Sequence, residues 1–247
     1  MSKNIDEKDI LISRISDLYY LSMERNKPEF TSFLNESEIS ICIEALKDFG
    51  ITDYYFFGGY ENSQRKVLGF FAKEEEYPIS IIEYKYRKQD KLTHRQFLGT
   101  ILSTGLNRNV IGDIVCMKGK TYVFVLENQA EYILSQINRI AKVGVKSKIV
   151  TLDNFDYTPT FKYHDYTVAS LRLDAVVAAI TGLSREKVRT LMLSGNVFKN
   201  YIEDTNISDK VSQDDIISIR KYGKFILDDI NGLTKKGRQK IKIKQYI

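Results

Sequence analysis

The sequence predicts a mixed α+β protein with more than one domain. Three observations support this prediction: a β-α-β-β-α-β rhythm in the middle of the chain, helical patterns followed by strand patterns before it, and two short arginine-bearing helices followed by strands after it. The 247 residues suit two or three small domains. With 43% hydrophobic and 28% charged residues, the composition is typical of a soluble globular protein.

The first segment, residues 1–75, is predicted to be an α+β domain. Helical periodicity covers Asp6–Met23 and Glu36–Phe49, and Asn35 with Glu38 three positions later predicts a capping box at the second helix. Two strands are predicted at 54–58 and 66–71. The aromatic run at 53–58 would permit base stacking, but alternating aromatic residues in a strand more often belong to a core.

The middle segment, residues 76–155, is predicted to be a ferredoxin-like domain that binds RNA. Its expected strands are Ile79–Tyr84, Ile111–Met117, Thr121–Leu126 and Val145–Thr151, and its expected helices are Thr93–Leu102 and Gln129–Ile140. RNA-recognition modules share this order, although Tyr122-Val123-Phe124-Val125 matches their aromatic motif only weakly.

His94 and Arg95 are candidate RNA-binding residues in this segment. Thr93 and Gln96 fit a capping box, which places His94 and Arg95 in the first helical turn, where backbone amides can bind an anion. The alternative is a solvated helix start whose histidine serves local packing.

Residues 156–168, including His164, are predicted to be a linker before a C-terminal domain at 169–247. A first short helix is expected after Ser170 as N-cap and before Gly182, and a second between Ser184 and Gly195. Strands are expected at 196–200 and 214–220. Arg185 and Arg189 lie one turn apart, a spacing at which two guanidinium groups can bind one phosphate ridge.

The positive charge of the chain is concentrated at its C-terminal end. The net charge is +5, and residues 166–247 hold 15 Lys and Arg against 9 Asp and Glu. Residues 231–247 contain six basic residues and no acid. We expect this basic tail to attract a polyanion.

The C-terminal motifs resemble the S4 (αL-type) RNA-binding domain. The matching residues are Arg172-Leu173-Asp174, Ser184-Arg185, Gly195-Asn196-Val197-Phe198-Lys199-Asn200 and Asp215-Ile216-Ile217-Ser218-Ile219. Two positions depart from the pattern, because Asp214 and Tyr201 stand where the family often has glycine.

The resemblance extends over roughly residues 1 to 240 to the bacterial YlmH family of S4-domain RNA-binding proteins. Further matching motifs are Leu92-Thr93-His94-Arg95-Gln96-Phe97-Leu98-Gly99, Ile111-Gly112-Asp113-Ile114 and Gly232-Leu233-Thr234-Lys235-Lys236-Gly237-Arg238. The resemblance implies a non-catalytic, cytoplasmic protein that binds structured rRNA or tRNA on the ribosome. The expected setting is the large subunit, in translation quality control of stalled subunits or in assembly.

The residues expected to contact RNA are all basic and come from the middle and C-terminal segments. They are Arg172, Arg185, Lys187, Arg189, Lys199, Arg220, Lys235, Lys236, Arg238, His94 and Arg95. Contacts of basic side chains with phosphates position the RNA backbone and carry little information about the base sequence.

Two other functions remain open from the sequence. The first is an adaptor that joins cell-division proteins through the N-terminal domain, and the second is an RNA-modifying enzyme of the pseudouridine synthase or methyltransferase type. Neither a glycine-rich nucleotide turn nor a P-loop, metal-ligand cluster or catalytic triad is evident, so we expect no catalysis, cofactor or metal.

Cys42 and Cys116 are expected to be buried reduced thiols. The protein is expected to be a monomer without signal peptide or membrane span.

Overall fold

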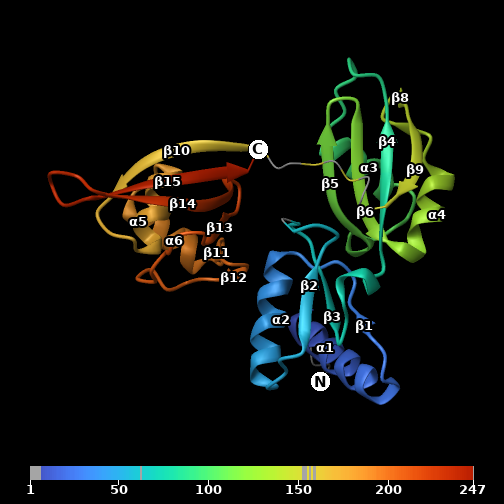
Figure 1. Ribbon diagram of the computed structural model, residues 1–247, viewed down its shortest axis with the longest axis horizontal. Helices are drawn as coiled ribbons and strands as arrows, with labels where there is room; N and C mark the ends of the chain where they lie inside the picture. The colour runs from blue at the N-terminus through green and yellow to red at the C-terminus, as the bar shows by residue number, and fades with distance from the viewer. Residues whose placement is uncertain (1–6, 62, 152–154, 156, 158–159, 247) are drawn as a thin grey trace, which may run out of the picture. The chain divides into compact units, whose positions relative to one another are not determined.

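The computed structural model describes residues 7–61, 63–151, 155, 157 and 160–246 (Figure 1). The chain forms two compact units, Met1–Tyr157 and Thr158–Ile247. The mixed α+β class predicted from the sequence is confirmed. No helix in the described ranges is long and apolar enough to cross a membrane.

The first unit begins with two helices and a small antiparallel sheet. The helices are α1 (Glu7–Arg25) and α2 (Glu36–Asp48). The sheet has the order β1-β3-β2, built from β1 (Glu29–Phe30), β3 (Val67–Phe70) and β2 (Tyr54–Phe57). The predicted capping box is confirmed, because the Asn35 side chain accepts from the Glu38 amide and the Glu38 carboxylate accepts from the Asn35 amide.

The second part of this unit is a four-stranded antiparallel sheet in the order β5-β6-β4-β9. Its elements are β4 (Ile79–Lys85), α3 (His94–Leu102), β5 (Ile111–Met117), β6 (Lys120–Leu126), α4 (Glu127–Gln136) and β9 (Lys146–Val150). Short 3-10 turns precede β4 at Glu74–Glu76 and β5 at Arg108–Val110. The predicted order of helices and strands is found along the chain.

One helix end differs from the prediction. We expected the helix to reach Ile140, but α4 ends at Gln136 and the chain turns into the hairpin of β7 (Arg139–Ile140) and β8 (Val143–Gly144). Ile137 and Ile140 are both buried, and their three-residue spacing is typical of a helix. They reach the core from extended backbone instead, which explains why the sequence pattern predicted a longer helix.

The two faces of the four-stranded sheet are covered by different cores. Ile82 and Val123 belong to the core beneath the helices, together with Phe97 of α3. On the other face, Phe124 packs with Phe33 from the N-terminal part. The segments that we predicted as separate domains, 1–75 and 76–155, therefore share a core within one unit.

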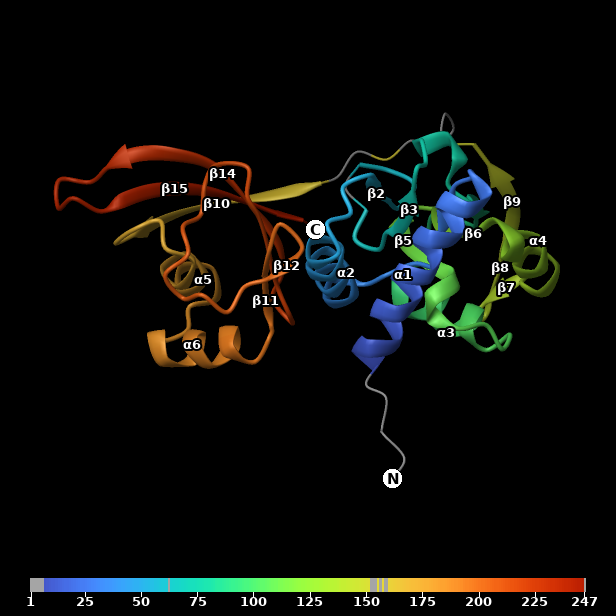
Figure 2. The same cartoon turned by 90° about the horizontal axis from the view of Figure 1, so that it is seen from below.

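The second unit is a six-stranded sheet in the order β10-β15-β14-β13-β11-β12 with two helices on one face (Figure 2). Its strands are β10 (Phe161–Val168), β11 (Val197–Lys199), β12 (Ile202–Glu203), β13 (Ile216–Ile219), β14 (Gly223–Leu233) and β15 (Gln239–Tyr246). The helices α5 (Leu173–Thr181) and α6 (Arg185–Leu193) bury Val176, Val188 and Met192 against the sheet.

Two segments of this unit were predicted wrongly. Residues 161–168, predicted as linker, form β10, and His164 bonds to Gln245 across the sheet at 3.0 Å. Residues 239–246 of the predicted basic tail form strand β15. Ile241 and Ile243 alternate with lysines and lie in the core, so the lysines occupy the outward positions of a strand rather than a solvated tail.

The helix starts and turns follow from backbone conformation. The first C-terminal helix begins at Leu173 with Arg172, not Ser170, at the N-cap, and it ends at Gly182 with φ +69° as predicted. Tyr201 and Asp214, which stand where glycine was expected, both have φ +68°. This left-handed conformation explains why glycine is favoured at the two positions.

Candidate nucleic-acid interface

Arg185 and Arg189 form an exposed pair on α6. Residues four positions apart lie on the same flank of a helix, and Val188 and Met192 bury the adjoining side. Within the part of the chain that the structure describes, neither arginine makes an ion pair or hydrogen bond with another side chain. Both guanidinium groups are therefore available to a phosphate ligand. We call these two residues the α6 arginine pair.

Lys187 is exposed but does not join the α6 arginine pair. It is two positions from each arginine, which rotates it by about 200° around the helix. The structure thus separates Lys187 from the two residues with which the sequence grouped it.

Arg172 is engaged within the protein. Its Nε and Nη2 donate to the two carboxylate oxygens of Asp174, each at 3.0 Å, and this hydrogen-bonded pair raises the pKa of Arg172. The arginine side chain is 44% exposed. A phosphate at this position would compete with the Asp174 carboxylate.

Lys199 holds a loop together rather than facing solvent. Its ammonium group contacts the Asp209 carboxylate and donates to the Lys210 carbonyl at 3.0 Å. The Asp209 carbonyl in turn accepts from the Leu173 amide at the start of α5. The Lys199 hydrogen bond lowers the pKa of Asp209, as expected of a stabilising ion pair. This lysine is best explained by its structural role.

The other C-terminal candidates lie apart from α6 along the chain. The Arg220 guanidinium lies 5.7 Å from the centre of the Phe198 ring, a cation–π contact. Lys235 and Lys236 are exposed in the turn between β14 and β15. Arg238 follows that turn and donates to the Thr167 carbonyl at 3.0 Å.

His94 and Arg95 occupy the first turn of α3, as predicted. Thr93 and Gln96 form the capping box, so the Gln96 amide already has a partner. Partial burial and the neighbouring Arg108 charge lower the pKa of His94, with Asp113 acting in the opposite direction. At neutral pH His94 can thus hydrogen-bond to a phosphate but adds little positive charge.

The sequence did not reveal the group of basic residues around Asp113. Burial, followed by the charge of Arg65, lowers the pKa of Arg108 to about 10, and burial also lowers the pKa values of Arg65 and Lys66. The Ile111-Gly112-Asp113-Ile114 motif marks this place in the sequence. Gln64 and Arg65, which bond to Asp113, lie more than 40 residues earlier in the chain, so no local sequence pattern reveals the group.

The aromatic residues of β6 are not available for stacking. Tyr122 and Phe124 are 1% and 0% exposed. Their rings pack against Phe155 with centroids 5.1 and 5.0 Å away, and Tyr60 covers Phe124 at 5.1 Å. In β2, the aromatic strand considered for stacking, Phe57 is buried, whereas Tyr55 is exposed and bonds to Glu74.

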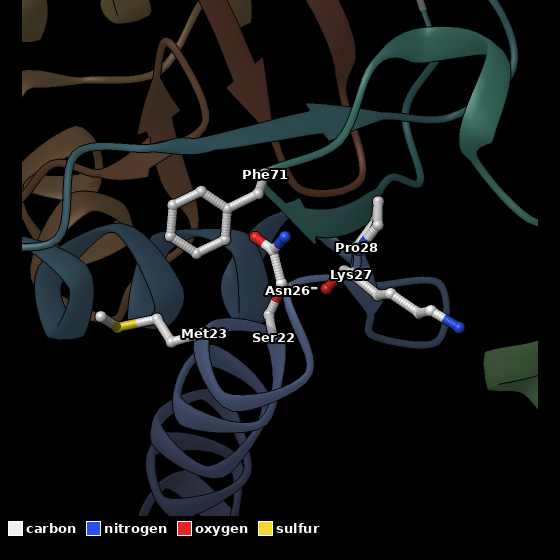
Figure 3. Close-up of a pocket in the computed structure, with 6 residues that line it drawn as sticks. All are labelled: Ser22, Met23, Asn26, Lys27, Pro28 and Phe71. Carbon is white, nitrogen blue, oxygen red and sulfur yellow. Dashed lines mark hydrogen bonds between the residues drawn. The ribbon is translucent and has the colours of Figure 1, made fainter.

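A separate hollow lies at the end of α1, where the chain leaves the helix (Figure 3). It measures about 320 Å³, and Met23 and Phe71 at its wall are 54% and 40% exposed. Its other lining residues are Ser22, Asn26, Lys27 and Pro28.

No cluster of three or more metal-binding side chains occurs among the residues that the structure describes. Cys42 is buried as predicted, and burial raises the pKa of its thiol to about 12. The prediction for Cys116 is wrong, because this cysteine is exposed on β5.

Residues 72–154 match the family model described as "Putative RNA-binding domain in YlmH". The chain is also 30% identical over 227 residues to the "Ribosome-associated protein quality control protein P2" of Bacillus subtilis (strain 168), and the match covers 88% of this chain and 87% of that protein. The chain belongs to the YlmH family. This confirms the resemblance derived from the sequence motifs.

A solved structure agrees with the YlmH fold. The "Cell division protein ylmH from Streptococcus pneumoniae" matches with a TM-score of 0.50 and 16% identity, over 63% of this chain and 98% of that one. At this identity the likeness concerns the fold alone.

Proposed function

We propose that this YlmH-family protein is a non-catalytic RNA-binding protein that acts on the ribosome, in the handling of stalled large subunits or in their assembly. The observation that carries the proposal is the α6 arginine pair, two exposed guanidinium groups one turn apart without an acidic partner among the described residues. The matching RNA-binding family model and the ribosome-associated relative support the same function.

The domain assignments belong to this proposal. We assign residues 169–247 to an S4-type RNA-binding domain, supported by two short helices packed on a sheet with the motif residues at their starts. We assign residues 76–155 to a ferredoxin-like RNA-binding domain, supported by the antiparallel order β5-β6-β4-β9. Residues 1–75 form the N-terminal part that packs on that sheet.

The expected RNA contacts can be ordered by their availability. Arg185 and Arg189 come first, followed by the other exposed candidates, which are Lys187, Lys235, Lys236, Arg95 and His94. Arg172, Lys199, Arg220 and Arg238 already have contacts within the protein, so RNA would have to share or replace them. Structured rRNA or tRNA fits this set because guanidinium and ammonium groups bind backbone phosphates.

The test is the double variant Arg185→Glu with Arg189→Glu in the full chain. We expect it to lose co-sedimentation with ribosomes while its thermal transition stays unchanged, because both side chains are exposed and make no ion pair with any residue that the structure describes. A matched control is Arg14→Glu with Lys47→Glu, which makes the same charge change at exposed positions of α1 and α2. Unchanged sedimentation of the α6 variant would refute this role.

A second candidate function is a protein-interaction adaptor, and the hollow beside α1 favours it. Its exposed Met23 and Phe71 form an apolar surface in the N-terminal part (Figure 3). Affinity capture with and without RNase separates the two functions. Protein partners that survive nuclease and are lost with Met23→Glu would favour the adaptor.

A further inference from the structure

The strands β6, β4 and β9 carry a row of three lysines on one face. Lys85 of β4 lies directly opposite Lys120 of β6 and directly opposite Lys146 of β9. Directly paired residues of antiparallel strands point to the same face, and neighbouring strands are about 4.8 Å apart. The row therefore spans about 10 Å, and Lys148 lies on the same face of β9, two residues along. We call these four residues the lysine patch.

The lysine patch lies on the face opposite the helices. Tyr84 and Val145, which alternate with Lys85 and Lys146, belong to the core beneath α3 and α4. Ile81, on the same face as Lys85, instead packs with Phe33 from the N-terminal part. This sheet face is thus divided into a buried apolar half and a cationic half.

The three strands that carry the patch have far more positive than negative charge. Glu83 is the only acidic residue on β6, β4 and β9, and its carboxylate contacts Lys85 at 3.3 Å and Lys148 at 3.9 Å. The Glu83 side chain is 8% exposed, whereas those of Lys85 and Lys148 are 61% and 65% exposed. One buried carboxylate thus lies among four lysines.

This arrangement is unfavourable for the free protein. Like charges directly opposite each other in a sheet are destabilising, and here two such pairs share Lys85. Glu83 offsets part of this repulsion. Places where a sequence breaks a local stability rule are commonly functional sites. A polyanion would remove the repulsion.

The chemistry that the patch offers is limited to ammonium groups. Tyr122, next to the patch on β6, is 1% exposed and accepts a hydrogen bond from Lys120 at 3.1 Å. Its ring is covered by Phe155, so a nucleobase cannot stack on it in this structure. A ligand would be held through its negative charges and not through its bases.

We propose that the lysine patch is a second RNA contact that binds the phosphate backbone without reading base sequence. The proposal rests on the proposed RNA-binding function, and it adds a site in the first unit to the α6 arginine pair of the second. RNA is favoured over a single small anion because four cations spread over three strands match a chain of charges.

The test compares two neutralised variants of the full chain. Lys146→Gln with Lys148→Gln removes two charges from the patch, and Arg139→Gln with Lys142→Gln removes two exposed charges from the β7–β8 hairpin as a control. Binding to a fluorescent RNA hairpin, to oligo-U and to oligo-A is measured over a range of salt concentrations, with wild-type residues at the α6 arginine pair and again with Arg185→Glu and Arg189→Glu.

For the patch variant we expect the slope of log affinity against log salt to become shallower by about 1.4 to 1.8, from two lost phosphate contacts. The decrease should be about 1.4 for both oligo-U and oligo-A and about 1.8 for the hairpin, and it should be absent in the control. The thermal transition of the free variant should stay close to that of the wild type, because the removed Lys85–Lys146 repulsion offsets the lost contact between Lys148 and Glu83. A patch important only for folding would instead give a lower transition temperature.

Several results would overturn the proposal. An unchanged salt slope in the patch variant, with binding still weakened by the α6 substitutions, would refute the patch and leave the proposed function intact. No salt-dependent RNA binding by the wild type would refute the proposed function itself. Polyglutamate or phosphatidylglycerol vesicles could instead bind the wild type more tightly than RNA does. If the patch variant lost that binding, the patch would be assigned to an acidic protein or to a membrane.

Discussion

The Asp113 carboxylate accepts a hydrogen bond from the backbone amide of Arg65 at 3.0 Å and so fastens β5 to the loop before β3. The same carboxylate accepts from the Gln64 amide at 2.7 Å and from the Tyr60 hydroxyl at 2.8 Å. The Arg65 guanidinium donates in return to the carbonyls of Ile111 and Phe33. These bonds join the N-terminal part to the four-stranded sheet.

Replacing Asp113 with alanine is therefore expected to destabilise the first unit. The change removes the acceptor of three hydrogen bonds and takes the Asp113 charge away from partly buried Arg65 and Arg108, which we expect to cost about 2–3 kcal/mol in the free energy of unfolding. Urea denaturation measures it. Asp90→Ala is the control, because an ion pair with the exposed Arg87 should contribute little to stability. Equal losses in both variants would contradict the prediction.

Two glycines of the same unit should respond to alanine in opposite directions. A Cβ at Gly112 would lie 2.6 Å from the Phe33 ring and 3.0 Å from Phe124 Cβ, so Gly112→Ala should lower stability by about 1–3 kcal/mol. Gly99 lies within α3 with nothing within 4 Å, so Gly99→Ala should raise stability by about 0.5–1 kcal/mol. Thermal denaturation of the two variants gives the signs directly.

Asp174→Asn is expected to strengthen RNA binding. The substitution removes the charge that holds the Arg172 guanidinium but keeps an oxygen for the Ala175 amide. If Arg172 then contacts a phosphate, the salt slope of RNA affinity should become steeper by about 0.7–0.9. Adding Arg172→Ala should abolish this gain. A gain that persists in the double variant would show that Arg172 is not its source.

His94 should make stability depend on pH. Since burial and Arg108 lower its pKa in the folded state, the unfolded chain binds the proton more readily. The free energy of unfolding should therefore rise as pH increases through the region just below the ordinary histidine pKa of 6.5 and level off above it. Transition temperatures between about pH 5.5 and 7.5 measure this, and His94→Gln should flatten the profile. An identical profile in the variant would exclude His94 as the cause.

Predictions from the sequence were most accurate where local chemistry decides the structure. The capping pairs Asn35–Glu38 and Thr93–Gln96 set two helix starts through contacts three residues apart, and Gly182 ended α5 through its own φ. Predictions failed where a distant partner decides. β10 pairs with β15 some 80 residues later, and without that partner its polar residues resemble a linker.

The sequence by itself determined the family, the order of most helices and strands, and the basic character of the C-terminal unit, because these depend on residue types and their spacing. Only the tertiary structure decided which cations are available. It bound Arg238 to the Thr167 carbonyl, left Arg185 and Arg189 exposed, and aligned Lys120, Lys85 and Lys146 across three strands. The reason is that side-chain partners and strand register are set by long-range packing, which fixes positions that no local pattern contains.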